Sequence, residues 1–206
     1  MEKERNLVII GAEDTGKTTL ANALLGKDIF PQSYDYVYFP TKACDSRMLT
    51  ETIRLTDTPG YNLLWETVPK DVVKAVAEAD TLVVMLSGEM VEEEVDIPPV
   101  DPEWEAYKAS EEALLNALLE GKTRDIYFVI PYTHQDWPEG QVPLTHALRL
   151  AQTHFSRFSD HGEKGFFCID PMQALEGELW ADDTMLTASG ILPLKAALLK
   201  QKGNQV

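Results

Sequence analysis

Residues 11–18, Gly11-Ala12-Glu13-Asp14-Thr15-Gly16-Lys17-Thr18, decide the fold that this sequence is expected to adopt. They follow the apolar run at residues 6–10, which predicts a buried strand. They open Lys17–Leu25, where apolar residues recur at helical spacing until Gly26. A glycine-containing turn between a strand and a helix lets backbone N–H groups converge on phosphate oxygens, and the helix N-terminus adds positive partial charge. The stretch therefore predicts a phosphate-binding P-loop.

This loop and the first turn of its helix supply most of the candidate nucleotide contacts. Lys17 is expected to reach the β- and γ-phosphates, and the Thr18 hydroxyl is expected to bind Mg²⁺. The other candidates for nucleotide binding are Gly11, Glu13, Asp14, Thr15, Gly16 and Thr19.

Strand-like and helix-like segments alternate along the whole chain. Further strands are expected at residues 52–56, 81–86, 126–130 and 166–169, and further helices at residues 69–79, 103–120, 143–158 and 190–200. This order predicts an α/β fold, a three-layer sandwich with a mainly parallel central sheet. Residues 1–206 are expected to form a single domain with an acidic insertion at about residues 88–112.

The charge balance restricts the class of partner. The 206 residues include 34 acidic and 18 basic side chains, a net charge of −16, which repels nucleic-acid phosphates and anionic lipids. We therefore expect no direct nucleic-acid binding. The sequence has no apolar stretch of transmembrane length and no signal-peptide pattern, and its two cysteines, Cys44 and Cys168, have no paired spacing. These features favour a cytoplasmic protein with reduced thiols.

Asp57-Thr58-Pro59-Gly60 follows the expected strand at residues 52–56. Asp57 can supply the carboxylate behind Mg²⁺ that nucleotide hydrolysis needs, and Gly60 can bring a backbone N–H to the γ-phosphate. In the loop at residues 28–42, Thr41 is our choice for a second hydroxyl at the metal, although an ordinary loop threonine is the alternative. Lys17, Thr41 and Gly60 are thus the candidate catalytic residues, and Thr18, Thr41 and Asp57 are the candidate metal ligands.

Residues 16–26, Gly-Lys-Thr-Thr-Leu-Ala-Asn-Ala-Leu-Leu-Gly, together with Asp57-Thr58-Pro59-Gly60, resemble the translation-factor-related GTPases of the Era, TrmE and dynamin-like group. The resemblance extends from Leu7 to about Leu199. The segment between the first switch and Asp57 is also similar to the ethanolamine-utilisation P protein and its propanediol counterpart. The resemblance implies a GTP-binding protein that hydrolyses GTP slowly to GDP and phosphate with Mg²⁺, as a switch or assembly factor.

The resemblance also implies a guanine-binding motif, whose place is taken here by Thr133-His134-Gln135-Asp136. Asp136 would accept hydrogen bonds from guanine N1 and N2, while His134 replaces the family's usual lysine. The family's later Ser-Ala pair aligns with Asp170-Pro171, and proline has no N–H to donate, so Met172 is the candidate substitute. A turn with a solvated Asp136 is the alternative interpretation.

Tyr61 stands where many switch GTPases have a glutamine that orients water. The resemblance therefore implies catalytic help from elsewhere: K⁺ held by Asp14, or an arginine from a partner or from a second copy in a nucleotide-dependent homodimer. A solvated turn residue is the alternative for Asp14. The switch segments are expected to contact a protein partner in a nucleotide-dependent way, through an apolar surface that includes Leu63, Leu64 and Trp65. Packing of these three residues in the core is the alternative.

Two alternative functions stay open from the sequence. A nucleotide-binding scaffold that does not hydrolyse is suggested by Tyr61 and Pro171. A P-loop kinase of a small metabolite would share the loop, but it needs neither Asp57-Thr58-Pro59-Gly60 nor Asp136 and usually has an arginine-rich lid. Measured phosphate release to water distinguishes the GTPase from both.

Overall fold

The computed structural model describes residues 3–31, 41–61, 68–86, 113–119, 124–131 and 163–200. They contain one six-stranded sheet in the order β2-β3-β1-β4-β5-β6. Its strands are β1 (Arg5–Gly11), β2 (Asp45–Met48), β3 (Ile53–Asp57), β4 (Thr81–Met85), β5 (Asp125–Pro131) and β6 (Glu163–Ile169). Only β2, at one edge of this sheet, runs antiparallel to its neighbour; the other described pairs are parallel.

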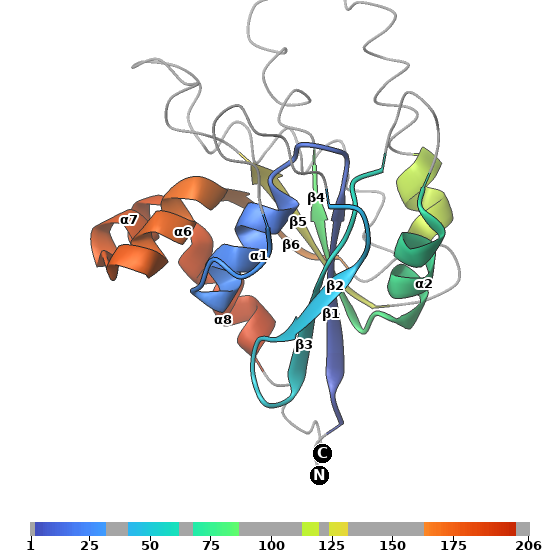
Figure 1. Ribbon diagram of the computed structural model, residues 1–206, viewed down its shortest axis with the longest axis horizontal. Coiled ribbons are helices and arrows are strands. Elements are labelled where there is room, and N and C mark those ends of the chain that lie inside the picture. Colours follow the sequence, from blue (N-terminus) through green and yellow to red (C-terminus); the bar gives the residue numbers. More distant parts are fainter. Residues whose placement is uncertain are drawn as a thin grey trace, which may run out of the picture.

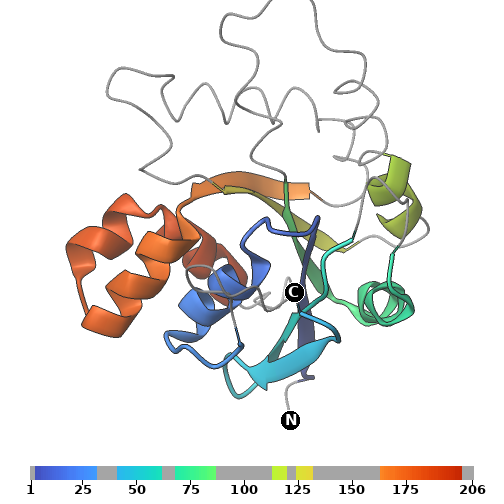
Figure 2. The same ribbon diagram turned by 45° about the horizontal axis from the view of Figure 1, so that its top comes forward.

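Helices cover both faces of the sheet (Figures 1 and 2). On one face lie α1 (Lys17–Leu25), α6 (Pro171–Trp180), α7 (Asp183–Ala188) and α8 (Ile191–Leu199). On the other lie α2 (Lys70–Glu78) and the helical residues 113–119. This confirms the predicted three-layer α/β sandwich with a mainly parallel sheet. None of the helices described is long and apolar enough to span a membrane.

The central strands are apolar along their length because both of their faces are covered. In β1, Leu7 and Ile9 belong to the core cluster that contains residues of α1, α6 and α8, while Val8 and Ile10 belong to the cluster that contains residues of α2. The alternation follows from the two-residue period of a strand. Rigid packing on both sides holds the carboxyl end of β1, where the P-loop begins.

Three elements were not predicted from the sequence: β2, α6 and α7. The sequence of β2, Asp-Ser-Arg-Met, has no apolar alternation; it pairs with β3, where the hydroxyls of Ser46 and Thr56 lie 2.8 Å apart. The signals for α6 are local. Asp170 caps this helix by accepting a hydrogen bond from the Gln173 N–H at 2.9 Å, and Pro171 occupies its first position.

Some expectations lie outside the described residues. They include the acidic insertion at about residues 88–112, most of the helix expected at 103–120 and all of the helix expected at 143–158. The single-domain organisation therefore stays a prediction.

Candidate nucleotide and magnesium site

The P-loop turns sharply between β1 and α1. Asp14 has a φ of 61° and Gly16 has a φ of 80°, so two of its residues adopt the left-handed conformation. Gly16 suits this conformation because it has no Cβ, and it forms the N-cap of α1. An added Cβ at Gly16 would lie 3.5 Å from Cγ of Pro171, so the start of α6 packs against the loop.

Lys17 lies across this loop and is only 6% exposed. Its ammonium donates a hydrogen bond to the Ala12 carbonyl oxygen at 2.5 Å, and the Thr15 hydroxyl donates to the same oxygen at 3.0 Å. Burial lowers the pKa of Lys17 to about 8, against the opposing charges of Asp57, Asp14 and Glu13. An anion bound in the loop would stabilise the charged lysine, as expected for a residue that contacts phosphates.

The three predicted magnesium ligands come together at the start of α1. The Thr18 hydroxyl donates to Asp57 Oδ2 at 2.8 Å, and it lies 3.0 Å from the Thr41 hydroxyl oxygen. The Thr41 hydroxyl lies 3.5 Å from the same Asp57 oxygen. These residues are far apart in sequence, and each arrives on a different segment: α1, the chain before β2, and the end of β3.

The chemistry of these donors fits Mg²⁺, which binds oxygen ligands and usually keeps several waters. Asp57 is 1% exposed, and its Oδ1 atom is buried without a hydrogen-bond partner among the described residues. Burial raises the pKa of Asp57, while the Thr18 hydroxyl and the Lys17 charge lower it. A nearby divalent cation would favour the charged carboxylate and would compensate for its burial.

The segment after Asp57 is attached to the P-loop through its backbone. The Tyr61 N–H donates to the Gly11 carbonyl oxygen at 3.2 Å, and the Glu13 N–H donates to the Tyr61 carbonyl oxygen at 3.1 Å. Gly60 therefore lies directly on Glu13: an added Cβ would be 2.6 Å from the Glu13 Cα. Only glycine fits such an approach of two backbones.

The side chain of Tyr61 is a packing residue. It is 1% exposed and clusters with Ala12, Val68 and Leu114. The sequence predicted that Tyr61 could not replace an orienting glutamine, and burial of the ring supports this interpretation. Sequence analysis missed the pairing of Tyr61 with Ala12, because no local pattern indicates a contact between such distant segments.

The chain beyond Thr41 is held by α2. The Cys44 N–H donates to Asp71 Oδ2 at 3.1 Å, and Asp71 lies in the first turn of α2. Burial raises the pKa of the Cys44 thiol to about 12, with a further contribution from the Asp71 carboxylate. Cys44 and Cys168 are both free.

The candidate base-binding residues are described only in part. Thr133, His134 and Asp136 lie outside the described residues. Met172 is the exposed second residue of α6, next to the Pro171 that packs on Gly16. Glu13 and Asp14 are exposed, and Thr19 is half-buried in α1.

Comparison with known sequences agrees with this geometry. Residues 6–131, from β1 to the end of β5, match the family described as 50S ribosome-binding GTPase. The chain belongs to the 50S ribosome-binding GTPase family. The P-loop, Thr41, Asp57 and Gly60 all fall inside the matched residues. Membership supports GTP binding and GTP hydrolysis in general, and it confirms the predicted translation-factor-related class. A search of the curated proteins finds no match.

Solved structures of GTPases share the fold. Era in complex with MgGDPNP and nucleotides 1506–1542 of 16S ribosomal RNA is 15% identical, with a TM-score of 0.61 over all of this chain and 60% of Era. A variant of Era from Aquifex aeolicus bound to GDP·AlF₄⁻ is 17% identical, with a TM-score of 0.54 over 90% of this chain and 57% of that one.

Translation elongation factor SelB from Methanococcus maripaludis, in complex with the GTP analogue GppNHp, is 18% identical. Its TM-score is 0.50 over 97% of this chain and 34% of SelB. The chain thus spans 60% or less of the length of these three structures. At such identities, the likeness shows the G-domain fold that members of the family share.

Proposed function

We propose that this protein binds GTP together with Mg²⁺ and hydrolyses it slowly to GDP and phosphate, acting as a switch or assembly factor. The observation that carries the proposal is the convergence of Thr18, Thr41 and Asp57 within 3.5 Å of one another, beside the buried Lys17. The second oxygen of the buried Asp57 carboxylate has no hydrogen-bond partner among the described residues, and a bound cation or its waters would satisfy it.

Each group has a defined task in this proposal. Lys17 binds the β- and γ-phosphates, and the Gly60 N–H donates to the γ-phosphate. Thr18 and Thr41 offer hydroxyls, and Asp57 offers its carboxylate, to Mg²⁺ and its waters. When bound, Mg²⁺ neutralises charge on the β- and γ-phosphate oxygens. Family membership supports guanine as the base, read by Asp136 with Thr133, His134 and Met172.

Phosphate release from GTP tests the proposed activity. Because the Tyr61 ring is buried and cannot orient water, the protein alone is expected to turn over at about 10⁻⁴–10⁻² per second. The experiment measures binding of GTP, GDP, ATP and XTP with Mg²⁺, followed by phosphate release. Binding of GTP with no release above the uncatalysed rate would contradict hydrolysis and favour a scaffold.

Asp136→Asn is expected to shift nucleotide preference from GTP towards XTP. The carboxylate accepts from guanine N1 and N2, whereas the 2-oxo group of xanthine needs a donor, which the asparagine amide supplies. Competition binding of the two nucleotides measures the shift. Asp183→Asn, an exposed change on α7, is the matched control. Equal binding of ATP and GTP by the unmodified protein would contradict the role of Asp136 in recognising guanine.

Hydrolysis is expected to be faster in K⁺ than in Na⁺ at equal ionic strength, and Asp14→Ala is expected to remove the difference. Asp14 lies in the phosphate-binding loop with its side chain exposed, so its carboxylate is available to a monovalent cation. A positive charge near the β–γ bridge stabilises the transition state. Identical rates in the two salts would exclude the cation and leave an arginine, from a partner or from a second copy in a nucleotide-dependent homodimer, as the source of that charge.

We propose a protein partner, contacted through the switch segments, and a cytoplasmic setting. The name of the family refers to the 50S ribosome, and the Era structure contains ribosomal RNA. For this chain, however, the net charge of −16 opposes direct contact with RNA phosphates. If it acts near a ribosome, a protein component is the more suitable contact.

A further inference from the structure

The proposed hydrolysis needs a group that orients the attacking water, and the side chains around Gly60 differ in their ability to do so. The Tyr61 ring is buried among Ala12, Val68 and Leu114. The Thr58 hydroxyl is buried and donates to the Ile9 carbonyl oxygen at 2.7 Å. Asp57 is buried beside Thr18 and Thr41. All three side chains are buried, with 1% or less of their surface exposed.

Glu13 is placed differently. Its backbone N–H is fixed by the Tyr61 carbonyl oxygen at 3.1 Å, and its Cα faces the Cα of Gly60. An added Cβ at Gly60 would lie 2.8 Å from the Glu13 Cγ, so the first part of the Glu13 side chain lies against Gly60. The residue as a whole is exposed. Two backbone hydrogen bonds, at Tyr61 N–H and Glu13 N–H, therefore hold the exposed Glu13 beside the residue expected to contact the γ-phosphate.

We propose that the Glu13 carboxylate accepts a hydrogen bond from the attacking water and orients it towards the γ-phosphorus, a task that Tyr61 cannot perform. This rests on the proposed GTP hydrolysis. In the reaction, the water oxygen bonds to the γ-phosphorus, and the bond from that phosphorus to the β–γ bridging oxygen breaks. The electron pair leaves with GDP, and both water protons stay with the released phosphate, which leaves as dihydrogen phosphate.

Because Glu13 is charged, its effect on the rate of hydrolysis can be distinguished from its effect on GTP binding. A carboxylate near the phosphates repels them, so removing it leaves GTP affinity unchanged or raises it. Removing a hydrogen-bond acceptor that acts on the water lowers the rate instead. A hydrogen bond to a charged group corresponds to about a 10- to 100-fold change in rate. A merely structural residue would lower stability and binding together.

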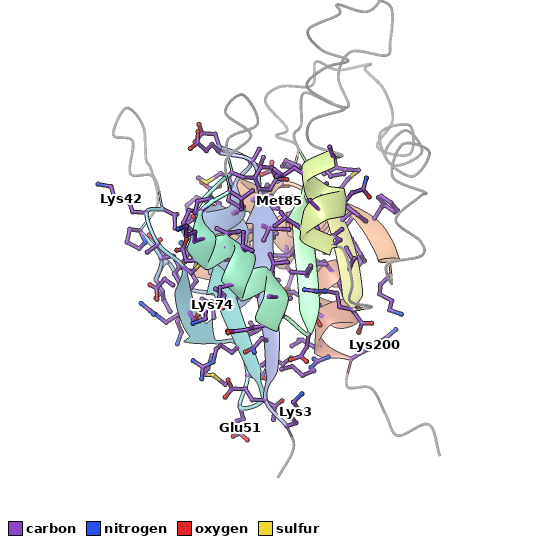
Figure 3. The ribbon with its side chains drawn as sticks, turned by 90° about the vertical axis from the view of Figure 1, so that its right-hand side faces the viewer. Lys3, Lys42, Glu51, Lys74, Met85 and Lys200 are labelled. Atoms are coloured by element: carbon purple, nitrogen blue, oxygen red, sulfur yellow. The ribbon has the colours of Figure 1, made fainter. Side chains whose placement is uncertain are left out.

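The experiment compares Glu13→Ala and Glu13→Gln with the unmodified protein and with Glu51→Gln. Glu51 is exposed and lies at the end of the sheet opposite Met85, whereas Gly11 of the P-loop pairs with Met85 (Figure 3). Each protein is loaded with GTP and Mg²⁺, and single-turnover phosphate release, the GTP dissociation constant and the thermal unfolding midpoint are measured. We expect Glu13→Ala to lose about 10- to 100-fold in rate with equal or tighter GTP binding.

Glu13→Gln keeps an acceptor oxygen but loses the charge, so its rate is expected to lie between those of the unmodified protein and Glu13→Ala, whereas Glu51→Gln is expected to match the unmodified rate. Unchanged hydrolysis in Glu13→Ala would overturn the inference, as would a Gln variant as slow as the Ala variant. Absence of hydrolysis in the unmodified protein would overturn the proposed function and this inference together. Failure of the proposed function would be seen in the unmodified protein, whereas failure of this inference alone would be seen only in the Glu13 variants.

Discussion

Replacing Lys17 with alanine is expected to weaken GTP binding by about tenfold or more while the fold is retained. The ammonium is buried against the Ala12 carbonyl oxygen and lies where the phosphates are expected. A charge-assisted hydrogen bond contributes about 1.5–3 kcal/mol, which sets this magnitude. In the nucleotide-free protein, the Lys17 side chain is desolvated and forms no ion pair with the described residues. Its removal is therefore expected to cost little stability.

Titration calorimetry gives the affinity, and thermal unfolding followed by circular dichroism reports on the fold. Lys74→Ala is the matched control, because Lys74 is an exposed lysine on α2 (Figure 3). Its affinity for GTP should equal that of the unmodified protein. An unchanged affinity in Lys17→Ala would mean that the loop does not bind phosphates as proposed.

Gly60→Ala is expected to lower GTP hydrolysis by about 100-fold or more while GDP binding is largely kept. The new Cβ would lie 2.6 Å from the Glu13 Cα and 2.7 Å from the Glu13 nitrogen. Both are backbone atoms, so rotation of a side chain cannot relieve the contact. The segment at Gly60 and Tyr61 must then move away from the P-loop, and the N–H proposed for the γ-phosphate moves with it.

The ratio of GTP to GDP affinity and the rate of phosphate release together test this prediction. GDP lacks the γ-phosphate, so GDP binding serves as the internal control for an intact loop. A Gly60→Ala protein that hydrolyses GTP at the unmodified rate would show that the close approach of Gly60 to Glu13 is not needed for catalysis.

The sequence allowed prediction of the parts of the site that depend on local patterns. The P-loop was predicted because its residues are consecutive and lie between a strand and a helix. Asp57 was predicted because it follows a short strand with β-branched residues and begins Asp57-Thr58-Pro59-Gly60. Thr41 was chosen from its place in a loop, and the structure now brings it to 3.0 Å from Thr18.

The remaining features depend on contacts between distant segments. Nothing near Tyr61 indicates that its backbone pairs with Ala12, and nothing in the polar β2 indicates that it pairs with β3. The helix α6 had a local signal, Asp170 before Pro171. The same two residues align with the family's Ser-Ala pair, so the pattern alone fits either a base-binding segment or a helix start.

Binding of GTP to the unmodified protein, measured by titration calorimetry in Mg²⁺ and again in EDTA, tests the central claim most directly. We expect Mg²⁺ to strengthen GTP binding by at least about tenfold, since Thr18, Thr41 and Asp57 lie within 3.5 Å of one another at the proposed metal site. Absence of GTP binding, or equal affinity with and without Mg²⁺, would contradict it.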